Sequence, residues 1–187
     1  MKRALSGVAI VLLTGALTIT LNAQTTTPVH PGAGGSPHVR TDWTVGGAHI
    51  SIEYGRPFLK GRAESEVMPP GQPWRTGADE ATTLTTDQPL VFGRLTVPAG
   101  TYTLYAVPGE SVWQLIVSKS TGQWGIPYPE GQDLGRVPMI TAKLKTPVEQ
   151  LTISIDPTLS RYSEENGGML IIEWGATSAS TIFEVGH

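Results

Sequence analysis

Apolar side chains recur at every second position over most of this chain. In the run AHISIEY, Ala48, Ile50, Ile52 and Tyr54 fall on one face, and the polar side chains between them fall on the other. The run EQLTISID, residues 149–156, alternates in the same way. A period of two is typical of β-strands that have one face in a core and one in water.

Further runs, such as TYTLYAV and GMLIIEWG, are apolar on both faces, as in central strands, and turn sequences rich in Gly, Pro and Asn separate them. No segment has the pattern of an amphipathic helix, and short connections favour antiparallel neighbours. The expected fold is an all-β antiparallel β-sandwich of about ten strands, with a closed barrel as the alternative. Strands are predicted at residues 39–45, 48–54, 81–86, 89–92, 94–97, 101–107, 112–118, 136–145, 149–156 and 168–174, with 179–185 as an eleventh.

The first residues have a different pattern. Lys2 and Arg3 precede an apolar run that extends to Leu21, and Ala23 is a small residue at a suitable cleavage position. This pattern predicts a secretory signal peptide, and an uncleaved membrane anchor is the alternative. The expected division is a signal peptide at 1–23, a flexible Thr/Gly/Pro-rich linker at 24–37 and a single β-sandwich domain at 38–187. The mature protein would then be periplasmic or secreted, with no stable membrane span.

Charge and cysteine content narrow the classes of partner. Cleavage after Ala23 leaves 11 basic and 16 acidic residues, a net charge of −5 with His neutral, and the chain has no basic run. Nucleic acids and anionic lipids are bound by clustered Lys and Arg, so neither is an expected partner. The chain has no Cys, which excludes disulfides and makes stability depend on a buried core.

Two connections, residues 55–77 and 119–135, are too long to be plain turns, and long loops in compact domains often carry function. The first contains Arg56, Arg62 and Arg75. These guanidinium groups predict either a pocket for a carboxylate, phosphate or sugar acid, or a structural ion network. The acidic side chains available to such a network are Glu53, Asp79, Glu80 and Asp133.

The run QPWRTGADEATTL, residues 72–84, contains more candidate site residues than any other short segment. We expect Trp74 to be buried at the end of the core. Arg75 is expected to tie the loop to Glu80, its best partner, across a turn at Gly77, or to backbone carbonyls. In the functional interpretation, Arg75 instead holds an anionic or carbonyl group, while Asp79 and Glu80 accept hydrogen bonds or act as acid and base.

The second long loop contains Gln123 and Trp124. An indole ring can stack on a pyranose face while a neighbouring amide bonds to sugar hydroxyls, so this pair predicts a saccharide platform. The alternative is an aromatic anchor that holds the loop to the domain.

The sequence contains no motif that indicates a particular catalytic reaction or a metal site. There is no HxH or HExxH, and His30, His38 and His187 lie near the ends of the expected mature chain, so no metal or other cofactor is predicted. A GxSxG motif and a phosphate-binding loop are also absent. The sequence therefore assigns no catalytic residue.

Five runs, IEYGRPFLKGR, PWRTGADEATTL, VPAGTYTLYAVPGESVWQLIVSK, QWG and PVEQLTISI, occur in this order. This series resembles the bacterial family called domain of unknown function (DUF) 2911 over residues 37–185. The resemblance implies export, because the family is associated with exported proteins, and it implies no activity, because none is established. The family pattern has Asn where this chain has Asp79, so an amide donor at that position is lost here.

These features predict an exported protein that binds a small molecule or saccharide between its two long loops, without chemical conversion. A hydrolase using the four carboxylates named above and a structural or assembly subunit are the alternatives. Arginine, Glu80 and Gln123 side chains that converge on an open cleft would favour binding or catalysis. Side chains that satisfy one another under a closed loop would favour the structural alternative.

Overall fold

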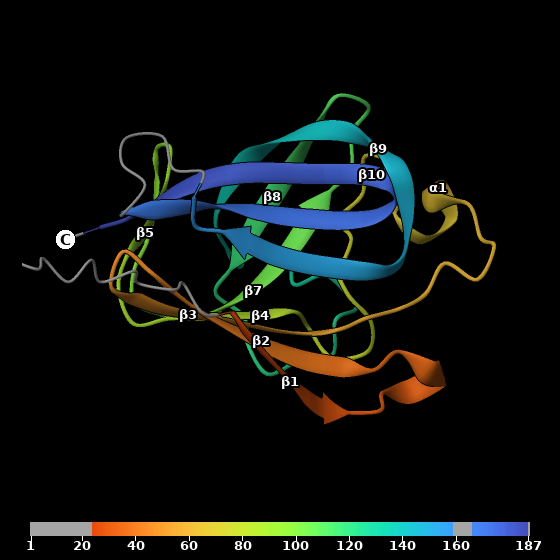
Figure 1. Ribbon diagram of the computed structural model, residues 1–187, viewed down its shortest axis with the longest axis horizontal. Coiled ribbons are helices and arrows are strands. Elements are labelled where there is room, and N and C mark those ends of the chain that lie inside the picture. The colour runs from red at the N-terminus through yellow and green to blue at the C-terminus, as the bar shows by residue number, and fades with distance from the viewer. Residues whose placement is uncertain (1–23, 159–165, 187) are drawn as a thin grey trace, which may run out of the picture.

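The computed structural model describes residues 24–158 and 166–186, so the predicted signal peptide lies outside the described residues (Figure 1). The described helices are short, namely the 3-10 helix η1 (Ala33–Gly35) and α1 (Glu64–Val67), and neither has the length and apolar character needed to cross a membrane. The strands are β1 (Thr25–His30), β2 (His38–Val45), β3 (Ala48–Gly55), β4 (Thr83–Thr86), β5 (Leu90–Phe92), β6 (Leu95–Val97), β7 (Gly100–Val107), β8 (Val112–Ser118), β9 (Asp133–Asp156) and β10 (Gly167–Val185).

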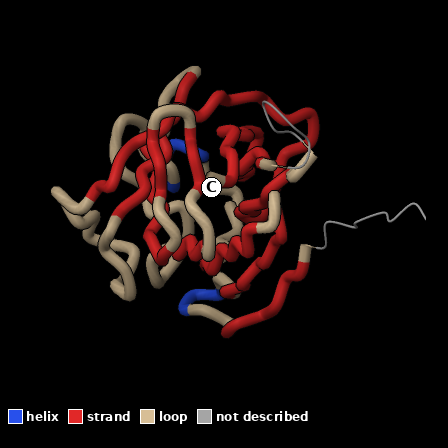
Figure 2. The backbone as a smooth tube through the Cα atoms, turned by 90° about the vertical axis from the view of Figure 1, so that its left-hand side faces the viewer, coloured by secondary structure: helices blue, strands red, loops and turns tan. Residues whose placement is uncertain are grey.

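All ten described strands belong to one antiparallel sheet, in the order β1-β2-β3-β4-β7-β8-β9-β10-β5-β6. The predicted all-β antiparallel fold is therefore confirmed. The sheet folds over on itself (Figure 2), so that β9 and β10 lie on one side and β2 to β4 on the other (Figure 1). One core lies between them, and it includes Ile50 and Leu84 from the first side and Ile153 and Ile172 from the second. The two layers are thus parts of one sheet.

β9 and β10 are longer than predicted, since each joins two of the predicted strands. The sequence WGATS, which links the predicted strands 168–174 and 179–185, is instead an irregularity within β10, where Gly175 has a φ of 62° and the pairing with β9 shifts register. The Glu64 carboxylate satisfies the backbone there, accepting hydrogen bonds from Ala176 N at 2.7 Å and Thr177 Oγ1 at 2.6 Å. The glycine at this position therefore marks a bulge within a continuous strand, and the Glu64 carboxylate, distant in sequence, stabilises that bulge.

Strand β1 lies in residues 24–37, where the sequence predicted a flexible linker. Its backbone pairs antiparallel with β2, with Thr26 opposite Thr41, and the pairing is irregular between Pro28 and His30. All six of its side chains are exposed. Burial therefore imposes no alternation on this strand, and the pattern that reveals the other strands is absent. The structure corrects the linker prediction for this segment.

The chain that leaves β3 covers part of the edge of β9. Leu59 N donates to Glu149 O at 2.9 Å, and Leu151 N donates to Pro57 O at 3.0 Å. Arg56 extends this contact, because its Nε donates to Leu151 O at 3.0 Å. The start of the long connection is thus a protective cover for a strand edge.

Candidate functional site

Trp74 fixes the candidate turn to the body of the domain. Its backbone exchanges two hydrogen bonds with Ala106 in β7, at 2.7 and 2.9 Å. Its side chain is 6% exposed, stacks on Trp174 with ring centroids 5.9 Å apart, and meets the edge of Trp113 at 6.1 Å. The predicted burial of Trp74 is confirmed.

Thr76 and Asp79, which follow Trp74 in the chain, have left-handed backbone conformations. Thr76 has a φ of 48° and Asp79 a φ of 60°, which is rare for a β-branched residue and more readily tolerated by Asp. Buried hydrogen bonds hold this geometry: Thr76 Oγ1 donates to Leu104 O at 2.7 Å, and Thr82 Oγ1 donates to Thr76 O at 3.0 Å. Strained backbone persists where surrounding structure enforces it, and such positions cluster at functional sites.

The predicted ion pair between Arg75 and Glu80 does not form in the described structure. Arg75 Nη1 instead donates weakly to the backbone carbonyl of Asp79, at 3.5 Å, which is the alternative kind of partner expected for it. Glu80 faces two histidines. Thr76 and Asp79, which lie between Arg75 and Glu80, have left-handed backbone that the sequence interpretation did not include. In the structure Arg75 contacts the carbonyl of Asp79, whereas Glu80 faces the histidines.

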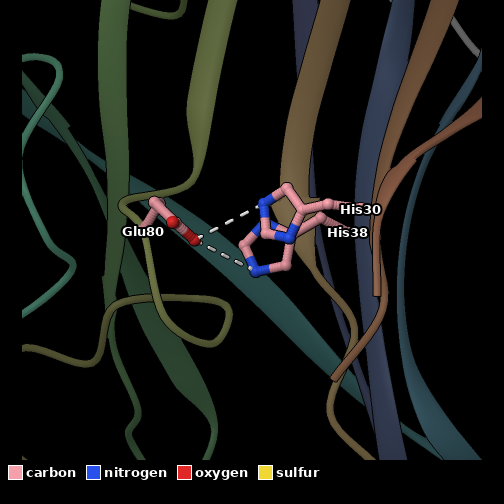
Figure 3. A group of neighbouring side chains, drawn as sticks. All are labelled: His30, His38 and Glu80. Carbon is pink, nitrogen blue, oxygen red and sulfur yellow. Dashed lines mark ion pairs between the residues drawn. The ribbon is translucent and has the colours of Figure 1, made fainter. Parts of the chain in front are cut away.

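His30, His38, Asp79 and Glu80 form a group that we call the rim cluster (Figure 3 shows three of its members). His38 Nε2 lies 3.3 Å from Glu80 Oε2 and 3.4 Å from Asp79 Oδ2. His30 Nε2 lies 3.7 Å from the same Glu80 oxygen, and the two imidazole rings stack with centroids 4.1 Å apart. Both rings therefore present a nitrogen to one carboxylate.

His38 is the buried member of the rim cluster. It is 2% exposed, and its Nε2 makes no hydrogen bond despite the two nearby carboxylates. Gly55 provides space for the ring, since a Cβ added there would lie 2.6 Å from His38 Nε2. Asp79 Oδ2 accepts a hydrogen bond from Ala33 N at 2.9 Å, which ties η1 to the turn. A buried polar atom without a partner calls for an explanation.

The loop after β8 lies next to the rim cluster. Gly125 N donates to Asp79 O at 2.9 Å and Ala81 N donates to Gln123 O at 3.1 Å, so the backbone holds Trp124 beside Glu80. Trp124 is 48% exposed. A Cβ at position 125 would lie 2.6 Å from Arg75 Cδ, so this close approach requires glycine.

Gln123 points inward, away from the exposed ring. Its Nε2 donates to Thr103 Oγ1 at 3.3 Å and to Ser120 O at 3.5 Å. The amide therefore serves the internal hydrogen bonds of the loop, and of the predicted saccharide pair only Trp124 is presented to solvent.

The other arginines predicted for the site bond to neutral groups near them in the structure. Arg56 Nη2 donates to Thr152 Oγ1 at 3.0 Å. Arg62 donates to the carbonyls of Leu59 at 2.9 Å and Phe58 at 2.6 Å. In the described residues, neither guanidinium group forms an ion pair, so the expected network with the carboxylates does not include them.

Asp133 lies in a hollow of about 390 Å³, which is lined by Pro73, Tyr128, Glu130, Gly131, Asp133 and Arg136. Arg136 Nε donates to Asp133 Oδ2 at 2.8 Å, and the Tyr128 hydroxyl donates to Asp133 Oδ1. Burial, followed by the Asp133 carboxylate, raises the pKa of Tyr128 to about 12. These groups satisfy one another, which is the structural outcome foreseen for the acidic residues.

The structure thus brings Asp79, Glu80 and Trp124 together, and adds two histidines that sequence reasoning set aside. His30 and His38 are register partners across β1 and β2. The sequence feature that could have indicated this pairing is the run PGAGGSP between the two histidines. Its Gly and Pro content is also typical of a connection between two strands. The sequence interpretation treated it as linker and predicted no metal site.

The fold and the rim cluster define the class of protein: a one-sheet antiparallel β domain with a histidine–carboxylate group at its rim. Residues 36–183 match the family described as "Protein of unknown function (DUF2911)". The chain belongs to this family, as its motifs indicated. No curated protein and no solved structure gives a significant match.

Proposed function

We propose that this protein is exported and binds a small molecule or saccharide, without chemical conversion, at the rim formed by residues 75–80, His30, His38 and Trp124. The observation that carries the proposal is the exposed ring of Trp124, which backbone hydrogen bonds hold beside Glu80. An indole that is exposed on a fixed loop gains burial when an apolar face stacks on it. The neighbouring carboxylate and imidazole groups supply polar contacts that orient a ligand.

Export is supported by the N-terminal sequence. Lys2 and Arg3, the apolar run and Ala23 are the elements that signal peptidase substrates share. Mass spectrometry of the protein from expressing cells is expected to show cleavage between Ala23 and Gln24. A purified chain that retains Met1 to Gln24 would contradict export by this route.

Ligand binding is tested by a thermal-shift screen of the purified protein against saccharides and small organic acids. A ligand that binds only the folded state at 100 times its Kd is expected to add about 2.7 kcal/mol of stability, which raises Tm by several degrees. Trp124→Ala is expected to abolish that shift while leaving the unliganded Tm nearly unchanged, because the ring is half exposed.

Ile140→Ala is the matched control. Ile140 is 74% exposed and pairs with Val112 at the start of β8, whereas Trp124 follows the opposite end of that strand. The control variant is expected to keep the full ligand shift. Equal shifts in the wild type and Trp124→Ala would remove Trp124 from the proposed site.

A further inference from the structure

We propose that His30, His38 and Glu80 bind one divalent transition-metal ion, an inference that rests on the proposed role of the rim as a ligand site. The three residues each offer one ligand atom, and these atoms lie within 4.8 Å of one another. The inference names a chemical class of ligand for the rim, in addition to the organic ligand proposed above.

The spacing of the ligand atoms suits an ion of the size of zinc. In tetrahedral zinc sites the metal lies about 2.0–2.1 Å from nitrogen and oxygen ligands, so neighbouring ligand atoms are about 3.3 Å apart. The distance between His38 Nε2 and Glu80 Oε2 is 3.3 Å, and that between His30 Nε2 and Glu80 Oε2 is 3.7 Å. The His30 side chain is 40% exposed, which leaves its ring room to tilt out of the stacked arrangement toward a shared ion.

The unpartnered nitrogen of His38 is the second observation that points to a ligand. Its Nε2 is buried and faces the carboxylates of Asp79 and Glu80 without a hydrogen bond to either. A metal ion between this nitrogen and Glu80 would satisfy the nitrogen. It would also balance the two carboxylates, which have no Lys or Arg ion-pair partner in the described residues.

The donor set indicates which ions fit. Two imidazoles and one carboxylate suit zinc and the neighbouring divalent transition metals better than magnesium or calcium, which prefer oxygen ligands. Asp79 would act from the side, since its Oδ2 is near His38 and already accepts a hydrogen bond from Ala33 N. Such supporting contacts orient ligand residues. With three protein ligands, one coordination position would face solvent and remain free for water or another ligand.

An ion at this point would join three segments of the chain. His30 ends β1, His38 begins β2, and Glu80 follows the strained turn. β1 has only exposed side chains, so it depends on backbone pairing with β2. Metal binding is therefore expected to slow proteolysis of residues 24–37 as well as to raise Tm.

The test is isothermal titration calorimetry of the metal-free protein with zinc chloride, using protein purified without a histidine tag. We expect one zinc per chain with a Kd of about 1 μM or lower. His30→Ala and Glu80→Gln are each expected to weaken binding at least about tenfold. Both residues are at the surface, so circular dichroism is expected to show unchanged folding.

His49→Ala is the matched control, because His49 is exposed and lies outside the rim cluster, and it is expected to bind zinc like the wild type. Absence of zinc binding in the wild type, or unchanged binding in both rim variants, would overturn the proposal. A Trp124-dependent thermal shift with an organic ligand would then still support the proposed function. Zinc binding without any such shift would support the metal site alone.

Discussion

Replacing Trp74 with alanine is expected to lower the free energy of unfolding by about 3–5 kcal/mol. The side chain is 6% exposed and packs between Trp174 and Trp113, so truncation leaves a cavity that the flanking indoles cannot fill without moving. Trp174 is itself held, since its Nε1 donates to Glu149 O at 3.1 Å. Urea denaturation followed by circular dichroism measures the loss.

Trp124→Ala supplies the control for this prediction, because it makes the same chemical change at a half-exposed ring. In the absence of ligand, its effect is expected to stay within about 0.5 kcal/mol. A loss below about 1 kcal/mol for Trp74→Ala would show that the turn is not anchored in the core. The turn would then depend on its own hydrogen bonds, including that from Thr76 to Leu104.

Tyr54→Phe is expected to destabilise the protein by about 1–3 kcal/mol. The Tyr54 hydroxyl accepts a hydrogen bond from Ile153 N at 2.8 Å and donates to Ile153 O at 3.4 Å, which joins β3 to β9. Burial raises the pKa of this hydroxyl, so it remains neutral and able to donate at physiological pH. The phenylalanine variant would leave the N–H of Ile153 buried without a partner.

Tyr102→Phe is the matched control, because the Tyr102 hydroxyl makes no hydrogen bond to any described side chain or backbone group. Its loss is expected to change stability by less than about 0.5 kcal/mol. The denaturant midpoints of the two variants are compared with each other. This comparison reports stability when the slopes of unfolding free energy against denaturant concentration are equal. Equal midpoints would mean that the contact between Tyr54 and Ile153 contributes nothing.

The run from Trp74 to Glu80 serves two purposes in the structure. Trp74 enters the core, while Asp79 and Glu80 belong to the rim cluster, and the left-handed residues Thr76 and Asp79 separate the two halves. The hydrogen bonds that hold this backbone are buried, so the position of the carboxylates follows from the core. The anchor and the proposed binding surface are therefore mechanically joined.

The position of Asp79 also bears on the family pattern. Asn and Asp are the residues that most readily adopt the left-handed conformation, apart from glycine. The φ of 60° at Asp79 suits Asp, and it would equally suit the Asn that the resemblance implies at this position. Here the carboxylate accepts a hydrogen bond from Ala33 N, a contact for which an amide oxygen would also serve.

Sequence alone determined the strand content of this protein, because burial of one sheet face forces apolar residues to alternate. The core strands β2, β3, β7 and β8 were predicted to within about one residue, since their inward side chains are apolar. The family was also evident from local motifs. Burial of Trp74 followed from its size and apolar character.

Tertiary structure decided what the polar residues do. β1 has no buried side chain to mark it, so only pairing with β2 reveals it, and that pairing places His30 beside His38. Glu80 meets them, and not Arg75, in a turn whose left-handed residues the sequence interpretation did not include. Hydrophobic alternation shows which side chains are buried, but it carries no information on contacts between polar groups that are far apart in the chain. The rim cluster therefore emerged only from the folded arrangement.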